Sequence, residues 1–250
     1  MSEYLGIIPA RFASSRFPGK PLADIGGKPM IRRVYERAVM ALDPVYVATD
    51  DQRIADAVYS FGGRVVMTSS RHGSGTERCA EAAATIAGLE NRTFDVIINI
   101  QGDEPFIRPE QIRNLMSCFN TGDTMIATLV RRAKSEDEIH NPNQPKVVVD
   151  KRGEALYFSR SPIPYLRNTD RAGWHGAYEF LIHVGMYGYR EDILRAITRL
   201  VPGNLERAES LEQLRWLENG YRIKTALTPY ETLAVDTPED LERLRSAGLV

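Results

Sequence analysis

The sequence predicts an α/β fold with a mostly parallel central sheet, and two observations support this prediction. Short apolar runs typical of strands alternate with segments whose apolar residues recur at helical spacing, in units of about thirty residues. Such alternation is the pattern of a parallel sheet covered by helices. The 250 residues, 43% hydrophobic and 26% charged, suffice for one domain with a full core. Ligands of these sheets bind beyond the carboxyl ends of the strands, so the segments that follow strands are candidates for a site.

The first predicted strand is Leu5–Ile8, and a loop without carboxylates follows it. Pro9 has no backbone N–H and is therefore expected to end the strand. The loop over 11–22 combines small residues with cations, and such segments can wrap a polyphosphate with amides, hydroxyls and positive charges. It matches neither the Walker A pattern nor G-x-G-x-x-G, and a basic surface turn is the alternative interpretation. Its polar residues are Arg11, Ser14, Ser15, Arg16 and Lys20.

Two further strand–helix units follow in order. Apolar residues at helical spacing predict a helix over 29–42, with arginines on its opposite face. The next strand is predicted over 45–48, and Asp51 is expected to cap a helix that a pair of glycines at 62–63 ends. A third strand is predicted over 65–67. The loops that follow these strands should meet at one edge of the sheet.

The segment after the third strand leads into an alanine-rich helix over 79–89. Ser74-Gly75-Thr76 offers hydroxyls and free amides at its start, although a plain N-cap would use the same residues. A near-continuous apolar run over 95–100 predicts a strand in the centre of the sheet. The acidic pair Asp103-Glu104 follows it, and Gly102 allows close approach of a ligand. Because an unpaired carboxylate at a buried strand end is costly, this pair is a candidate site for Mg²⁺ and phosphate.

The second half departs from the strand–helix alternation. A helix is predicted over 109–119 and a strand over 125–130. Two strands over 146–150 and 155–159 then flank Lys151-Arg152-Gly153, which predicts an antiparallel hairpin insertion. The remaining elements are a strand over 180–189, a capped helix over 210–219, a strand over 223–227, and a last helix that Thr237 caps and Pro238 opens.

Some polar residues of this half are candidates for binding. Arg160 and Arg167 follow the hairpin and could bind an anion. His183 lies on an apolar strand, where a lone histidine is more often a core residue than a ligand. Tyr187 lies four residues further on, so strand alternation places both side chains on one face. Asp236 stands directly before the last helix, where it could reach a metal.

Charge and cysteine content exclude several classes of protein. The net charge of −1 lacks the basic excess that gives nucleic-acid binders their nonspecific affinity. Cys79 and Cys118 are too few for a disulfide framework and lack metal-ligand spacing. No apolar run approaches the length of a membrane span, and no signal-peptide-like segment precedes Pro9 and Arg11. We therefore expect a cytoplasmic protein with neither a nucleic-acid nor a membrane partner.

A set of segments, in chain order, resembles one enzyme family. The segments are IIPARFASSRFPGKPL, SGTER, NIQGDEP, YFSRSPIPY, HVGMYGYR, SLEQLRWLENG and VDTPEDLE. Together they are similar to the 3-deoxy-manno-octulosonate cytidylyltransferases, the CMP-Kdo synthetases, over essentially the whole chain. The resemblance implies a Rossmann-like nucleotidyltransferase fold in a single domain over 1–250. It implies transfer of CMP from CTP to the sugar acid Kdo, with release of pyrophosphate, for lipopolysaccharide biosynthesis. It also implies Mg²⁺ as cofactor and a homodimer whose contacts involve the hairpin insertion at about 142–189.

The same resemblance implies roles for individual residues. Arg11, Ser15 and Lys20 would hold the CTP phosphates, Ala10 and Gln101 would lie near the cytidine, and Arg78 would lie beside the nucleotide. Asp103 and Asp236 would ligate the metal, and with Lys20 and Arg11 they form the expected catalytic set. The sugar pocket would comprise Arg160, Arg167, His183, Tyr187, Glu212 and Gln213.

The expected reaction agrees with the charges of these residues. Attack of a sugar hydroxyl on the α-phosphorus needs in-line positioning and neutralised phosphate charge, but no covalent nucleophile on the protein. One metal or two would be compatible with the sequence. Two alternatives stay open: a cytidylyltransferase for a related acid, such as sialic acid or an amino-substituted Kdo, and a noncatalytic sugar-nucleotide binding module on the same fold.

Overall fold

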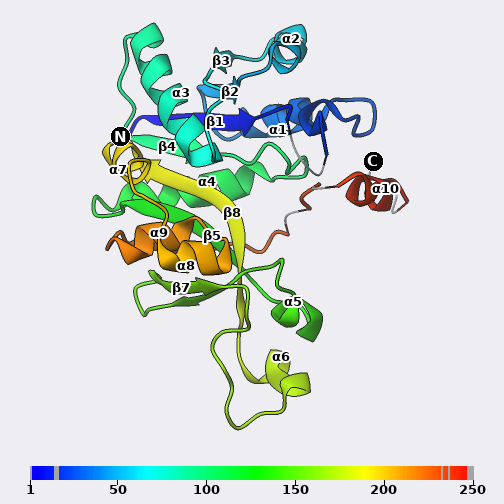
Figure 1. Ribbon diagram of the computed structural model, residues 1–250, viewed down its shortest axis with the longest axis vertical. Coiled ribbons are helices and arrows are strands. Elements are labelled where there is room, and N and C mark those ends of the chain that lie inside the picture. Colours follow the sequence, from blue (N-terminus) through cyan, green and yellow to red (C-terminus); the bar gives the residue numbers. More distant parts are fainter. Residues whose placement is uncertain (1, 14–16, 232, 236, 247–250) are drawn as a thin grey trace. The chain divides into compact units, whose positions relative to one another are not determined.

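The computed structural model describes residues 2–13, 17–231, 233–235 and 237–246, and the chain divides into two units (Figure 1). The first unit comprises Met1–Arg113 and Thr232–Val250, and the second comprises Asn114–Glu231. Within the described part of the chain, no helix is both long and apolar enough to cross a membrane.

Parallel strands form the sheet of the first unit, in the order β3-β2-β1-β4 (Figure 1). In register, Ala10 lies opposite Thr49, and Thr49 lies opposite Met67, so the carboxyl ends of the first three strands coincide. All residues of the fourth strand are buried, as its continuous apolar run predicts. The strands are β1 (Tyr4–Ala10), β2 (Val45–Thr49), β3 (Val65–Met67) and β4 (Val96–Asn99).

The expectation that Pro9 ends the first strand is wrong. Strand β1 continues to Ala10, and Pro9 pairs with Ala48 of β2. The N–H of Gly6 points toward the β2 side, where it donates to the carbonyl of Pro44. Backbone N–H groups alternate in direction along a strand, and Pro9 lies three residues after Gly6. The position of its missing N–H would therefore face the β4 side, where pairing with β1 ends at Ile7. The proline therefore removes no ladder hydrogen bond to β2.

The helices of the first unit follow the predicted caps. Asp51 and Ser74 each accept a hydrogen bond from a backbone N–H of the helix that they precede. The first helix ends at Ala38 rather than at the predicted Leu42. The helices are η1 (Lys20–Leu22), α1 (Met30–Ala38), α2 (Gln52–Ser60), α3 (Gly75–Glu90) and α10 (Pro238–Ser246), and α4 (Pro109–Ser117) crosses the boundary of the units.

Helix α10 returns the C-terminal segment to the first unit. Leu241 and Leu244 pack with Ile25 and Met30 in one buried cluster that also contains Val235. Thr237 caps the helix as predicted, since its hydroxyl accepts the N–H of Asp240 at 3.3 Å. This packing brings residues from both ends of the sequence to the same side of the unit.

The second unit contains the predicted antiparallel hairpin. Strands β6 and β7 pair with each other, and β6 also pairs with β8. Strand β5 runs antiparallel to β8 and parallel to β9. The strands are β5 (Ile126–Arg132), β6 (Lys146–Val149), β7 (Ala155–Ser159), β8 (Leu181–Arg190) and β9 (Ile223–Leu227). Together with the first unit, these pairings confirm the predicted α/β class, mostly parallel with an antiparallel insertion.

Short helices connect these strands, and most of them were not predicted. The expected helix over 210–219 begins only at Gln213, because Ser210 has a left-handed backbone (φ 51°) and ends a separate helix. The helices are η2 (Cys118–Asn120), α5 (Glu136–His140), η3 (Arg171–Gly173), α6 (Trp174–Ala177), α7 (Glu191–Ile197), α8 (Asn204–Glu209) and α9 (Gln213–Glu218).

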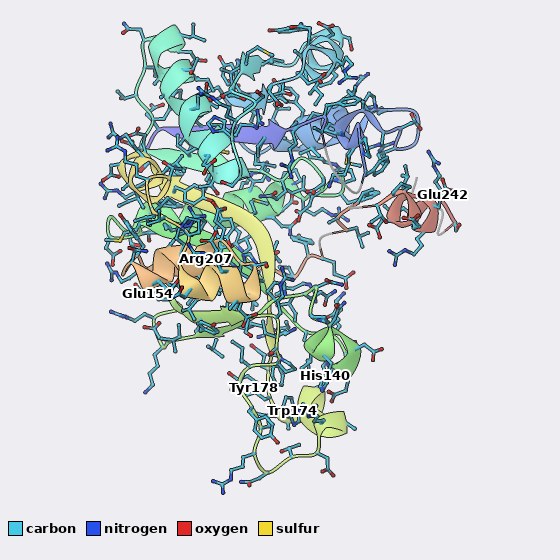
Figure 2. The ribbon with its side chains drawn as sticks, viewed as in Figure 1. His140, Glu154, Trp174, Tyr178, Arg207 and Glu242 are labelled. Atoms are coloured by element: carbon cyan, nitrogen blue, oxygen red, sulfur yellow. The ribbon has the colours of Figure 1, made fainter. Side chains whose placement is uncertain are left out.

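A small apolar cluster holds the segment between β7 and β8. Trp174 stacks on Phe180 with their rings 5.8 Å apart, and both pack with Ile139 of α5. The ring of His140 lies 5.7 Å from that of Trp174 (Figure 2). Aromatic packing thus orders a segment that contains little regular secondary structure.

Candidate functional site

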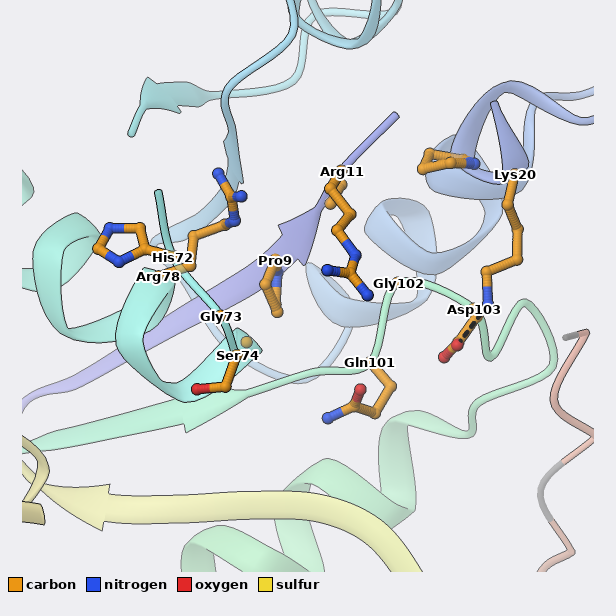
Figure 3. A pocket seen from close by; sticks show the side chains of 13 residues that line it. Pro9, Arg11, Lys20, His72, Gly73, Ser74, Arg78, Gln101, Gly102 and Asp103 are labelled. Carbon is orange, nitrogen blue, oxygen red and sulfur yellow. Dashed lines mark hydrogen bonds and ion pairs between the residues drawn. The ribbon is translucent and has the colours of Figure 1, made fainter. Parts of the chain in front are cut away.

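A cavity of about 240 Å³ lies at the carboxyl edge of the first unit's sheet (Figure 3). Its walls come from the end of β1, the start of α3 and the segment that follows β4. This is the edge where the sequence predicts a ligand. The lining residues are Pro9, Ala10, Arg11, Lys20, Pro21, His72, Gly73, Ser74, Gly75, Arg78, Gln101, Gly102 and Asp103.

An ion pair between Lys20 and Asp103 stands at one side of this cavity. Lys20 Nζ lies 2.7 Å from Asp103 Oδ2, and Figure 3 shows the lysine reaching down to the carboxylate. The two side chains are 14% and 28% exposed, so both can still be reached by a ligand. The pair joins residues that lie 83 positions apart in the sequence. A predicted phosphate ligand and a predicted metal ligand are therefore in direct contact.

Arg11 provides a second cation at the cavity. Its side chain extends toward the segment that contains Gln101 and Gly102 (Figure 3). Among the residues that the structure describes, no carboxylate pairs with its guanidinium, which is exposed. Arginine can donate two parallel hydrogen bonds to a phosphate. This group is thus ready to accept an anion.

Arg78 lines the cavity but is already engaged. Its side chain is 4% exposed, Nη1 donates to Thr68 Oγ1 at 2.6 Å, and the same nitrogen lies 3.4 Å from Asp50 Oδ1. Thr68 and Asp50 directly follow β3 and β2. The guanidinium therefore ties the ends of two strands together at the cavity wall.

The start of α3 forms another wall. Two glutamates stabilise it by accepting backbone hydrogen bonds from the segment that precedes the helix. Ser74 Oγ accepts the N–H of Glu77 at 3.2 Å, and Glu77 Oε2 accepts the N–H of Gly73 at 2.8 Å. Glu81 binds His72 Nε2 and accepts the N–H of Ser69 at 3.0 Å. The pKa of Glu81 is lowered, with the Ser69 N–H as the largest cause and His72 adding to it.

Sequence reasoning did not select His72, although it lines the cavity. Its position two residues before Ser74-Gly75-Thr76 was the signal that could have identified it. The other members of this wall were anticipated as a source of hydroxyls and amides.

Gly102 lets the segment after β4 approach β1 closely, whereas the prediction was that it allows close approach of a ligand. A Cβ atom at this position would lie 2.9 Å from the carbonyl oxygen of Pro9, which is backbone and cannot easily move. Replacing Gly102 with alanine should displace Gln101 and Asp103 and lower the rate of the reaction that the resemblance implies by about tenfold to a hundredfold. Steady-state turnover of the purified variant measures this effect. Gly88→Ala is the matched control, since nothing lies within 4 Å of its Cβ position. Normal turnover by Gly102→Ala would show that this close approach has no importance for the site.

Two predicted site residues, Ser15 and Asp236, lie outside the described residues. The chain next to Asp236 is nevertheless located, because the N–H of Val235 donates to the carbonyl of Asp103 at 3.0 Å. Within the described ranges, no group of three or more histidine, cysteine, aspartate or glutamate side chains could hold a metal. Of the two predicted metal ligands, Asp103 is the one that lies within the described residues.

Two of the predicted sugar ligands, His183 and Tyr187, pack together in the second unit. Their ring centroids are 5.4 Å apart, which confirms that they share one face of β8. His183 Nε2 lies 3.0 Å from Thr128 Oγ1, and the ring is packed against Phe158. Burial lowers the pKa of His183 to about 4, so its imidazole is neutral near pH 7.

Unsatisfied polar atoms gather near this pair of rings. Tyr187 Oη and Gln213 Nε2 are buried and have no hydrogen-bond partner among the described residues. Trp216, one turn beyond Gln213 on α9, packs on the Tyr187 ring at 5.1 Å. Burial raises the pKa of Tyr187 well above its ordinary value, and the charge of Glu212 adds to this shift. Buried polar groups without partners are uncommon in proteins and are candidates for ligand contact.

The two predicted sugar-binding arginines differ in their surroundings. The guanidinium of Arg160 donates to the carbonyls of Glu209 at 2.6 Å, Pro142 at 2.9 Å and Ser210 at 3.2 Å. It therefore supports the turn that precedes Glu212 and Gln213. Arg167 is exposed and has no ion pair with any residue that the structure describes.

Comparison with known proteins identifies relatives over nearly the whole chain. A family model described as Cytidylyltransferase matches residues 5–224. A 3-deoxy-manno-octulosonate cytidylyltransferase of Parabacteroides distasonis is 56% identical, with 97% of each chain covered. One from Bacteroides thetaiotaomicron is 54% identical, with 96% of each chain covered. A solved structure of a CMP:2-keto-3-deoxy-manno-octonic acid synthetase complexed with CTP is 44% identical, covers 99% of each chain and has a TM-score of 0.89.

Proposed function

The chain belongs to the 3-deoxy-manno-octulosonate cytidylyltransferases. From this premise we propose that the cavity of the first unit binds the CTP from which CMP is transferred to Kdo. The observation that supports this most strongly is the meeting of Arg11, Lys20 and Asp103 at one cavity. Two cations and a carboxylate at the carboxyl edge of a parallel sheet suit a nucleoside triphosphate. The solved relative that was complexed with CTP has the same fold.

The cations of the cavity have a direct role in this reaction. Arg11 would hold phosphate oxygens with its guanidinium, which pairs with no carboxylate of the described residues. Lys20 would leave Asp103 for the triphosphate, which as a whole carries more negative charge than one carboxylate. Both cations would then neutralise charge that grows on the phosphates as the sugar hydroxyl attacks and pyrophosphate departs. Gln101, at the cavity floor, would contact the cytidine.

Asp103 fits the role of a magnesium ligand. Magnesium usually binds through one or two carboxylates together with substrate phosphates, so it does not need a larger cluster of protein ligands. Asp103 is accessible and lies beside the chain that carries Asp236. When bound, Mg²⁺ would neutralise phosphate charge and make the attacking hydroxyl more acidic. The departure of Lys20 to a phosphate would free the carboxylate of Asp103 for this metal.

We place the sugar acid in the second unit, at the unsatisfied groups near His183. Tyr187 Oη and Gln213 Nε2 could each bind a sugar hydroxyl, and His183 would stay neutral while doing so. Glu212, at the start of the same helix, would be another hydroxyl ligand. Arg160 or Arg167 would pair with the carboxylate of the sugar acid.

Tyr187→Phe tests this sugar site, because it removes only the hydroxyl that has no partner among the described residues. The KM for Kdo should rise about tenfold while the KM for CTP stays unchanged, since one buried polar contact is worth about 1 to 3 kcal/mol. The free energy of unfolding should not fall, because no hydrogen bond within the described protein is lost. Steady-state kinetics and chemical denaturation measure these quantities. Tyr178→Phe is the control, because Tyr178 is exposed and packs on Phe180 in the separate aromatic cluster. A change in the KM for CTP alone would place the sugar elsewhere.

Two alternative functions would use the same fold: transfer of CMP to a related sugar acid, and noncatalytic binding of a sugar nucleotide. Release of pyrophosphate from CTP and Mg²⁺ should be measured with Kdo, an amino-substituted Kdo, sialic acid and a neutral sugar. We expect Kdo to be preferred and the neutral sugar to be refused, because the latter has no carboxylate for an arginine. Preference for another acid would reassign the substrate, and absence of pyrophosphate with every acid would indicate a binding module. Lipopolysaccharide biosynthesis as the role, a homodimer and a cytoplasmic location stay predictions.

A further inference from the structure

We propose that Phe12 and Arg53 form a clamp that positions the loop carrying Arg11 and Lys20. The clamp fixes where these two cations stand at the cavity. This inference rests on the proposed function only in taking the cavity as the place where CTP binds. Phe12 and Arg53 do not themselves line the cavity, so they act as positioning residues.

The base of the loop closes at Phe12 and Gly19. The N–H of Gly19 donates to the carbonyl of Phe12 at 2.9 Å, so the two residues meet across the loop. Gly19 has a left-handed backbone (φ 72°), and a Cβ there would lie 3.1 Å from the Phe12 ring. The ring therefore packs directly on the glycine backbone, and the left-handed φ together with this tight Cβ distance favours glycine at position 19.

Arg53 covers the Phe12 ring at a short distance. Its guanidinium carbon lies 3.3 Å from the ring centroid, which is a stacked cation–π contact. Asp51 holds that guanidinium with two hydrogen bonds, at 2.9 Å to Nε and 2.6 Å to Nη2. Asp51 also caps α2 by accepting the N–H of Arg53 at 3.0 Å, so the arginine is anchored to the start of a helix. Arg53 is the largest cause of a lowered pKa at Asp51.

The two cations of the cavity are direct neighbours of the clamped residues. Arg11 precedes Phe12 in the sequence, and Lys20 follows Gly19. Joining Phe12 to Gly19 therefore sets the separation of Arg11 and Lys20. The contact of Arg53 with the ring attaches the Phe12–Gly19 pair to α2, a helix of the same unit. Holding Arg11 and Lys20 in place before CTP arrives reduces the entropy that binding would otherwise have to offset.

The experiment measures CTP binding by calorimetry, without sugar, for Arg53→Gln, Phe12→Leu and the double variant. Each single variant should weaken CTP affinity about three- to tenfold, within the range of a cation–π contact. The double variant should be no weaker than the poorer single variant, because both changes break one contact. Arg53→Lys should keep part of the affinity, since its ammonium can still lie over the ring.

Arg92→Gln is the matched control. Arg92 also lies over an aromatic ring, that of Phe94 at 5.1 Å, and pairs with Glu3, but it precedes β4 at the opposite edge of the sheet. Its CTP affinity should equal that of the unmodified protein, and thermal midpoints should show whether any variant has lost stability. Unchanged CTP affinity in folded Arg53→Gln and Phe12→Leu, or effects that add in the double variant, would overturn the clamp. If the unmodified protein binds CTP but makes no product with Kdo, the proposed function fails and the clamp can still be tested.

Discussion

Replacing Asp103 with asparagine is expected to lower CMP transfer about a thousandfold or more, because a bound divalent cation supplies several kcal/mol of transition-state stabilisation. Asparagine keeps the shape of the side chain but loses the negative charge that would hold the metal. The side chain is 28% exposed and lies outside the apolar core, so the variant should remain folded. Pyrophosphate release at saturating CTP and Kdo measures the rate, and thermal unfolding checks the fold.

Asp95→Asn is the matched control for this change. Asp95 directly precedes the same strand, at the opposite end from Asp103, and it accepts the N–H of Glu3 at 2.8 Å. The Asp95→Asn substitution removes one negative charge, as Asp103→Asn does, but at a residue that does not line the cavity. It should therefore leave turnover unaffected. Near-normal activity of Asp103→Asn at low Mg²⁺ would show that Asp103 is not a metal ligand.

Replacing Lys20 with alanine is expected to lower kcat about a hundredfold or more. In the free protein this ammonium neutralises Asp103, and during the reaction it would neutralise the phosphates. A fixed cation acts mainly on charge that develops in the transition state, so its loss should affect kcat more than the KM for CTP. Steady-state kinetics with CTP as the varied substrate separate the two constants.

Lys28→Ala serves as the control for Lys20→Ala. Lys28 also makes a 2.7 Å ion pair, with Glu36, but its side chain is 41% exposed and does not line the cavity. Exposed pairs of this kind contribute little to stability, and turnover should be unchanged. A Lys20→Ala variant that raises only the KM for CTP would assign the lysine to ground-state binding.

Much of the fold could be predicted because its long elements have clear periodicity and caps. The helix after Asp51 and the buried strand before Gly102 are examples, as is the β6–β7 hairpin. The short helices of the second unit could not be predicted from sequence. Runs of four to seven residues make too few turns to show a helical period of apolar residues. Ser210 illustrates the same limit, because its left-handed backbone ends a helix that sequence alone merges with the next.

The nucleotide site could be predicted in outline because parallel strands bring their carboxyl ends to one edge. Ala10, Arg11, Lys20, Gln101 and Asp103 meet there as expected. The contact between Lys20 and Asp103 could not be foreseen, since local patterns carry no information on pairs so distant in sequence. The engagement of Arg160 with three backbone carbonyls was equally hidden, because it depends on where α8 ends. His72 was missed, although its position two residues before Ser74-Gly75-Thr76 could have identified it.

The central claim is that this chain joins CMP to Kdo, and the most direct measurement is detection of the product. The purified protein should be incubated with CTP, Kdo and Mg²⁺, and the mixture analysed by mass spectrometry and for pyrophosphate, with Asp103→Asn as the inactive reference. We predict CMP-Kdo and pyrophosphate in equal amounts, formed only when all three components are present. Pyrophosphate release that does not depend on Kdo, or consumption of CTP without a CMP–sugar product, would contradict the account.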